Sequence, residues 1–165
     1  MRKMVLFTLL ALLFAATFPQ APLAATPDDR VALKGVKTGK VVFDINITDA
    51  EKLPLYLQVI TETVAGLKKQ GVKPEVVIAF RGAAVRFAST DRKNFSTEVK
   101  DHLVDSDELI VDLAKQGVRF EACAIATRLF KVDNATILPQ VTVVGNTFIS
   151  LIGYQAKGYA LIPIY

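Results

Sequence analysis

The only cysteine of this 165-residue chain, Cys123, lies at the junction of two short apolar runs. Residues 116–128 read QGVRFEACAIATR, in which Gly117 ends a preceding helix. The run 118–123 is predicted to form a strand, and the small-residue run 124–131 a helix. Cys123 would then lie at the carboxyl end of a strand, where the N–H groups of the next helix face the sulfur and lower the thiol pKa. This placement is typical of a reactive thiolate.

A structural interpretation of Cys123 stays open beside the chemical one. Free cysteine is among the most buried residue types and often only fills space. Apolar neighbours such as Phe120 and Ile125 could bury the sulfur. A single cysteine excludes an internal disulfide and a two-thiol redox cycle. The sequence therefore allows a nucleophile, a buried structural residue or a disulfide between chains.

Four further residues are candidates for binding near Cys123. Arg81 follows the apolar run 75–80, and a guanidinium at a neighbouring strand end would favour the thiolate. The alternative for Arg81 is an ordinary surface arginine. Gly82 and Gly145 leave room for a close approach of the backbone, and Asn146 follows the apolar run 141–144. We take these four residues as the predicted binding set.

The motifs of common cofactor and metal sites are missing. The glycines near the strand ends stand singly, in RGAAVR and VGNTF, and match no phosphate-binding or dinucleotide-binding spacing. One histidine and one cysteine are too few for a metal site of the usual cysteine and imidazole kind. We expect neither a cofactor nor a metal. The histidine, His102, is a conceivable base, but a solvated helix position is the favoured interpretation.

Residues 1–25 are predicted to be a secretory signal peptide. They combine a basic tip, an apolar run of about 14 residues and a region of small residues with prolines. The run is shorter than the roughly 20 residues that a membrane-spanning helix needs, and cleavage near Ala24 or Ala25 fits best. Residues 26–39 form a polar leader segment. We therefore expect a periplasmic protein that has no membrane association after the signal is removed.

The charge of the chain argues against a nucleic-acid partner. The full sequence has 20 basic and 16 acidic residues, and removal of Arg2 and Lys3 with the signal leaves a net charge of +2. The charges are scattered and do not form basic clusters interleaved with aromatic residues. About 140 mature residues are enough for one domain with its own core.

Predicted strands and helices alternate along residues 40–165. Asp49 is expected to cap the first helix, and Asp105 with Glu108 resembles a capping box for a later one. This alternation predicts an α/β domain with a mostly parallel five-stranded sheet and helices on both faces. Ligands of such folds bind at the carboxyl ends of the strands. The predicted strands are 40–47, 75–80, 118–123, 141–144 and 159–164. The predicted helices are 50–70, 83–87, 105–117, 124–131 and 146–157, and the ambiguous pattern of residues 96–104 leaves open whether that stretch is helical too.

Three segments carry a family resemblance, in the order VKPEVVIAFRGAAVRF, LAKQGVRFEACAIAT and ILPQVTVVGNTFISLIGYQAKGYALI. Residues 40–165 resemble the DsrE/DsrF-like family, in particular its exported members of the intracellular sulfur oxidation type. The resemblance implies a flavodoxin-like fold, assembly into dimers, trimers or hexamers, and a cysteine that carries sulfur as a persulfide. Cys123 matches that cysteine by position. Relatives frequently have histidine at the position of Arg81, so the resemblance carries no proton-transfer role over to this arginine.

Two functions follow from these observations. The leading hypothesis is a periplasmic sulfur-relay protein, in which Cys123 accepts sulfur from a donor, holds it as a persulfide and passes it to an acceptor protein. The alternative is a non-catalytic oligomeric binding module with a buried structural cysteine.

Overall fold

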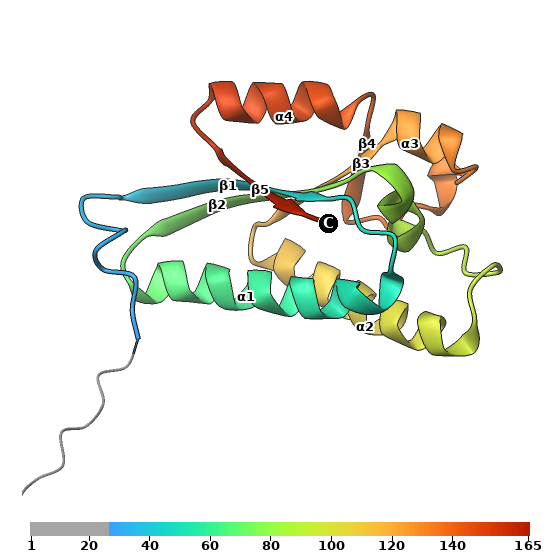
Figure 1. Ribbon diagram of the computed structural model, residues 1–165, viewed down its shortest axis with the longest axis horizontal. Helices are drawn as coiled ribbons and strands as arrows, with labels where there is room; N and C mark the ends of the chain where they lie inside the picture. The colour runs from blue at the N-terminus through green and yellow to red at the C-terminus, as the bar shows by residue number, and fades with distance from the viewer. Residues whose placement is uncertain (1–26) are drawn as a thin grey trace, which may run out of the picture.

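A computed structural model describes residues 27–165 as a parallel five-stranded sheet between helices (Figure 1). The strands are β1 (Thr38–Ile45), β2 (Lys73–Phe80), β3 (Arg119–Cys123), β4 (Val141–Val144) and β5 (Ala160–Ile164). The α-helices are α1 (Leu53–Lys69), α2 (Thr97–Lys115), α3 (Ala124–Leu129) and α4 (Thr147–Ala156). Three short 3-10 helices are η1 (Ala50–Lys52), η2 (Gly82–Ala88) and η3 (Asn134–Thr136). The predicted α/β class is confirmed, and the predicted signal peptide 1–25 lies outside the described residues.

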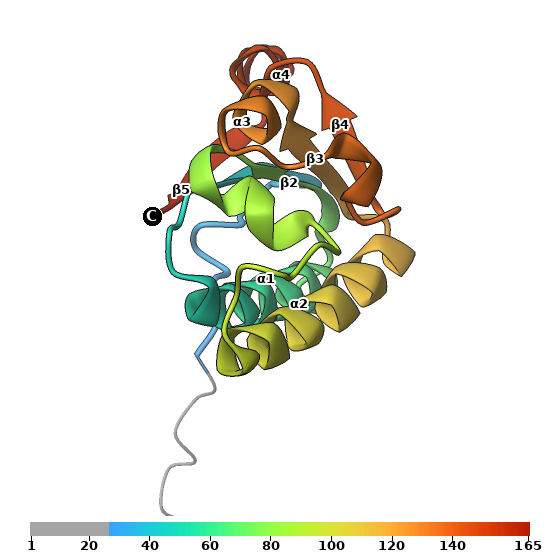
Figure 2. The same ribbon diagram turned by 90° about the vertical axis from the view of Figure 1, so that its right-hand side faces the viewer.

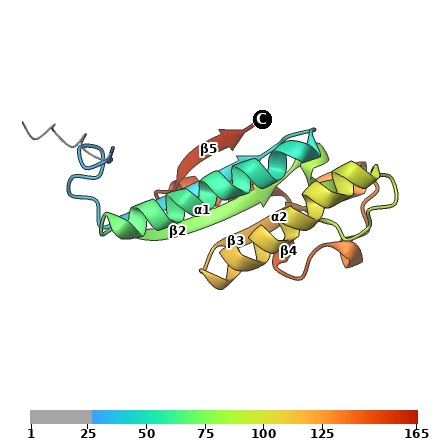
Figure 3. The ribbon, with the colours of Figure 1, turned by 90° about the horizontal axis from the view of Figure 1, so that it is seen from below.

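The sheet has the order β4-β3-β2-β1-β5, and every pair of neighbouring strands is parallel. The first four strands follow one another across the sheet, and β5 then pairs with the free side of β1. Helices α1 and α2 lie side by side on one face, as Figure 3 shows from below. Helix α4 covers the opposite face, and α3 lies near it at the end of the sheet (Figures 1 and 2). The three layers are those expected, although flavodoxin itself orders its strands 2-1-3-4-5.

The main core lies between the sheet and the helices α1 and α2. Helix α1 packs an apolar face against the sheet, in which Leu53, Leu57, Ile60 and Val64 are all buried. A smaller apolar cluster lies under α4 and joins residues of β1 and β2 to Leu151. The central strands are thus covered on both faces, which explains why they read as unbroken apolar runs.

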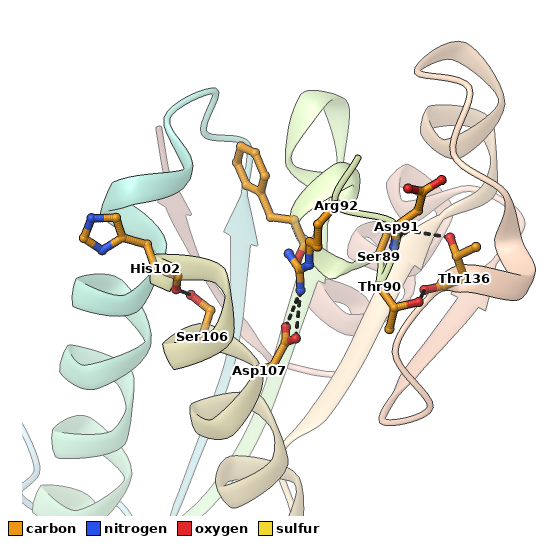
Figure 4. Close-up of polar contacts among 9 residues, drawn as sticks. Ser89, Thr90, Asp91, Arg92, His102, Ser106, Asp107 and Thr136 are labelled. Atoms are coloured by element: carbon orange, nitrogen blue, oxygen red, sulfur yellow. Dashed lines mark hydrogen bonds and ion pairs between the residues drawn. The ribbon is translucent and has the colours of Figure 1, made fainter. Parts of the chain in front are cut away.

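The predicted cap of the second long helix at Asp105 is wrong, and the ambiguous residues 97–104 belong to the helix. Helix α2 begins at Thr97, and the hydroxyl of its N-cap, Ser96, accepts a hydrogen bond from the amide of Val99. The buried face of the helix includes Leu103, so packing against the core continues upstream of Asp105. Ser106 donates its hydroxyl hydrogen to the carbonyl of His102 within the helix (Figure 4).

β4 has its predicted bounds, and most other boundaries differ from the predicted ones by a few residues. β1 begins at Thr38, so the end of the polar leader joins the sheet. The start of the leader is held against the end of α1, where the amide of Asp29 donates to the side chain of Gln70. Asp49 accepts a hydrogen bond from the amide of Glu51 and caps η1, which leads directly into α1. Of the helices that the structure describes, none has the length and apolar character needed to cross a membrane.

Candidate thiol site

Cys123 occupies the predicted position at the carboxyl end of β3. It is the last residue of the strand and the N-cap of α3. Only 5 % of Cys123 is exposed, yet the residue lines a pocket of about 350 Å³ at the end of the sheet. Most of the wall is apolar and comes from α3 and α4, including Ile125, Leu129 and Phe148. The thiol is therefore close to the surface, but only along one apolar pocket.

The groups around the sulfur favour its ionised form. Burial raises the pKa of Cys123, but the neighbouring amide and hydroxyl of Thr147 lower it, and the amides of Ala126 and Ile125 lower it further. The net result is a thiol pKa below its ordinary value. Amides and a hydroxyl that donate to an anion are what a nucleophilic cysteine requires.

Thr147 is the functional candidate that the sequence prediction missed. It is the first residue of α4, and its buried hydroxyl oxygen has no hydrogen-bond partner among the described residues. β4 places it there, because Val144 pairs with Cys123 and α4 starts three residues later. The sequence signal was present in the Asn146 cap before Thr147, but pattern alone does not reveal which side chain faces the neighbouring strand.

Arg81 lies at the same pocket, as predicted, but its guanidinium is bound to a partner that the prediction did not assign. Its Nε and one terminal nitrogen donate to the two carboxylate oxygens of Asp44 at 2.6 and 2.8 Å. The Arg81 and Asp44 side chains are 19 % and 4 % exposed, and the ion pair raises the pKa of Arg81. Asp44 thus largely neutralises the charge of Arg81. The ionised sulfur of Cys123 is stabilised mainly by Thr147 and by the amides of Ala126 and Ile125.

The other predicted binding residues divide into two groups. Gly82 and Asn146 line the thiol pocket, whereas Gly145 does not belong to its wall. Gly82 has a left-handed backbone with φ +55°, and a side chain there would collide with Asn46. A Cβ on Gly145 would meet no atom within 4 Å, so nothing approaches this glycine closely. The Asn146 side chain accepts a hydrogen bond from the amide of Phe148 at 2.9 Å and caps α4.

His102, the candidate base, is not part of the thiol site. His102 lies half-buried in the first half of α2 and does not line the thiol pocket. Within residues 27–165, no group of three or more histidine, cysteine or acidic side chains is arranged to hold a metal ion.

The fold and the single thiol at a strand end define an α/β protein with one candidate reactive cysteine, and comparison with known proteins identifies the family. The sequence profile of the DsrE/DsrF-like family matches residues 40–164, and the chain belongs to this family. An uncharacterized protein of Aquifex aeolicus (strain VF5) is 31 % identical over 126 residues, which cover 75 % of this chain and 55 % of that protein. The chain thus spans about half the length of this relative.

Two solved structures share the fold. A protein of unknown function from Methanobacterium thermoautotrophicum matches with a TM-score of 0.61 and 22 % identity, over 76 % of this chain and 99 % of that one. The ychN protein from E. coli matches with a TM-score of 0.53 and 14 % identity, over 77 % of this chain and 100 % of that one. At these identities the likeness concerns the fold alone.

Proposed function

We propose that this protein is a sulfur carrier that holds sulfane sulfur as a persulfide on Cys123. The proposal rests on the groups that surround the sulfur of Cys123. The thiol pKa is lowered, the buried Thr147 hydroxyl has no hydrogen-bond partner among the described residues, and Cys123 lines a pocket of about 350 Å³. The chain belongs to the DsrE/DsrF-like family. The resemblance to this family implies a cysteine that carries sulfur as a persulfide, which supports the same chemistry.

The proposed transfer needs only one cysteine and no external oxidant. The Cys123 thiolate attacks the outer sulfur of a donor persulfide. The S–S bond of the donor breaks, a new S–S bond forms on Cys123, and the donor leaves as a thiolate. Attack by an acceptor thiolate on the outer sulfur of the Cys123 persulfide repeats the exchange and restores the Cys123 thiolate. Thr147 and the α3 amides would stabilise the anionic sulfur at Cys123 in both steps.

A non-catalytic binding module is the second candidate, because only 5 % of Cys123 is exposed. In that case the cysteine fills the end of the core, and the pocket serves another purpose. The rate of Cys123 alkylation by iodoacetamide, measured against pH, separates the two functions. A carrier gives a titration midpoint below the roughly 8.5 of a free thiol, and a structural cysteine stays unreactive.

The proposal also covers location and partners. We infer export to the periplasm through residues 1–25, as in the exported sulfur oxidation type of the family, with a sulfur donor and an acceptor protein there. A second copy of the chain is the further proposed partner, because α4 exposes Phe148, Ile149 and Ile152 beside the edge strand β5. Replacement of Ile149 by lysine should shift the mass measured by light scattering towards the monomer. An unchanged mass would count against contact through α4.

A further inference from the structure

A second pocket, of about 160 Å³, lies next to the thiol pocket and differs from it in chemistry. Phe130, which follows α3, lines both pockets and forms the ridge between them. The wall of the second pocket is mainly polar and includes two cations, Arg86 of η2 and Lys131. It lies outside the thiol site described above.

Arg86 is held in place but keeps most of its donors free. Its Nε–H donates to the carbonyl of Ala83, and the guanidinium lies 5.8 to 6.0 Å from the ring centres of Phe87, Phe95 and Phe130. These rings fix the plane of the guanidinium without using its terminal N–H groups. In the part of the chain that the structure describes, Arg86 forms no ion pair.

Lys131 contributes the second cation from a backbone conformation that disfavours a side chain. Its φ of 56° is the only positive φ of a non-glycine residue in residues 27–165. It follows the C-cap of α3, where glycine is the usual choice. Within the described residues, Lys131 also lacks an acidic partner. The strained backbone is explained if the ammonium group is needed at this pocket.

The two acidic residues of the same pocket are already occupied. Asp91 forms an ion pair with Lys93, and Asp133 accepts a hydrogen bond from the amide of Ala135 and caps η3. The pocket therefore offers two free cations, but its two carboxylates disfavour a doubly charged ligand such as phosphate or thiosulfate. An arginine fork with a lysine beside it suits a single carboxylate.

The wall of the pocket is rigid where η2 and η3 meet. Ser89 and Thr136 share a hydrogen bond of 2.6 Å between their hydroxyl groups, and the Asp91 amide donates to Ser89 (Figure 4). Arg92 forms a bidentate ion pair with Asp107 and ties the same loop to α2, as Figure 4 shows. A ligand would thus meet a preformed site.

We propose that Arg86 and Lys131 bind the carboxylate of a small-molecule persulfide. The Cys123 thiolate attacks the outer sulfur of this persulfide, its S–S bond breaks, and the parent thiolate leaves. The apolar chain of this molecule passes Phe130 and fills the thiol pocket beside Leu129. The part of the inference that concerns sulfur rests on the proposed carrier function, and the part that concerns the carboxylate does not. The substrate class is therefore the persulfide of a thiol that has one carboxylate and an apolar spacer.

The test compares two maleimides that differ only in charge, 6-maleimidohexanoate and its neutral amide. The rate constant for Cys123 modification is measured with each reagent at low ionic strength. We expect the carboxylate to react about fivefold faster than the amide, the size of one favourable ion pair. The ratio of the two rates cancels any change in the thiol pKa, because both reagents meet the same thiolate.

Three variants locate the effect. The ratio should fall towards one in Arg86→Gln and in Lys131→Gly, and Lys131→Gly should also raise the thermal midpoint by about 3 °C, because glycine relieves the strained backbone. Arg128→Gln is the matched control, since Arg128 lies on α3 but lines neither pocket, and the ratio should be kept. A ratio near one in the unmodified protein, or the same ratio in Arg86→Gln and Arg128→Gln, overturns the proposal.

A second measurement does not depend on the thiol. Cys123→Ser protein is titrated with hexanoate and with hexanamide and followed by NMR. Hexanoate should shift the signals of Arg86 and Lys131, and hexanamide should not. Absence of a hexanoate shift overturns the carboxylate site. An unreactive thiol together with a hexanoate shift would overturn the sulfur carrier and support the carboxylate site.

Discussion

Thr147, the first residue of α4, contributes both its amide and its hydroxyl to lowering the pKa of Cys123, the last residue of β3. No hydrogen-bond partner of this buried hydroxyl oxygen is found in residues 27–165. A buried hydroxyl without a partner is costly, and an ionised sulfur is the acceptor at hand. An ionised Cys123 would therefore give the Thr147 hydroxyl an acceptor. The first two predictions follow from this pairing.

Replacement Thr147→Val should slow the alkylation of Cys123 at neutral pH by up to about tenfold, because a hydrogen bond to a charged group is lost. The midpoint of the alkylation rate against pH should move upward. Iodoacetamide kinetics at a series of pH values measure both effects. Thr147→Ser keeps the hydroxyl and should keep the midpoint. Thr142→Val is the matched control, because it makes the same replacement at an exposed position of β4. Equal midpoints in Thr147→Val and the unmodified protein would show that Thr147 does not stabilise the ionised sulfur of Cys123.

The lowered thiol pKa should also make folding stability depend on pH. The folded state ionises Cys123 more readily than the unfolded state, so ionisation stabilises the fold. This contribution is fully present above the pKa of the unfolded thiol, near 8.5, and is lost as the pH falls through the lower folded pKa. The free energy of unfolding should thus exceed that of Cys123→Ser by a margin that grows with rising pH. Urea unfolding of both proteins across neutral and mildly alkaline pH measures the margin, and a constant margin contradicts the prediction.

Asp44→Asn should destabilise the protein by about 3 kcal/mol, because it leaves the guanidinium of Arg81 without its buried partner. The exposed pair of Lys115 and Asp112 offers a control, since their side chains are 71 % and 67 % exposed. Asp112→Asn should change stability by less than about 0.5 kcal/mol. Urea denaturation compares the two variants. Similar small losses in both would mean that Asp44 does not hold Arg81 at the pocket.

Gly82→Ala should cost about 2 kcal/mol, because alanine is strained at φ +55° and its methyl group meets Asn46. Gly66→Ala is the control, because Gly66 lies within α1 and a methyl group there meets nothing within 4 Å. That substitution should stabilise the protein by about 0.5 to 1 kcal/mol. Thermal unfolding of both variants gives the comparison, and equal signs of the two changes would refute this account of Gly82.

The features that the sequence predicted well are those set by local patterns. β4 was predicted with its observed bounds, and Cys123 was placed correctly at a junction of strand and helix, because buried strands read as short apolar runs. The features that it missed depend on neighbours distant in sequence. Arg81 meets Asp44 because Asp44 pairs with Ala79, two residues upstream of Arg81 on the same face. No local pattern contains that register.

The start of α2 shows the same limit. Asp105 and Glu108 match a capping signal, but the burial of Leu103 keeps the chain helical upstream of Asp105. Tertiary packing overrode a local preference there. The position of Thr147 beside Cys123 likewise depends on the pairing of β3 with β4. A single sequence can therefore propose the nucleophile, and the groups that tune it emerge only from the fold.

Intact mass spectrometry after exposure to polysulfide tests the central claim most directly. The protein without residues 1–25 is treated with polysulfide, freed of excess reagent and weighed, with Cys123→Ser as the control. We predict a gain of one sulfur atom, about 32 Da, that dithiothreitol reverses and that the serine variant lacks. An unchanged mass, or the same gain in Cys123→Ser, would contradict the assignment of Cys123 as a persulfide carrier.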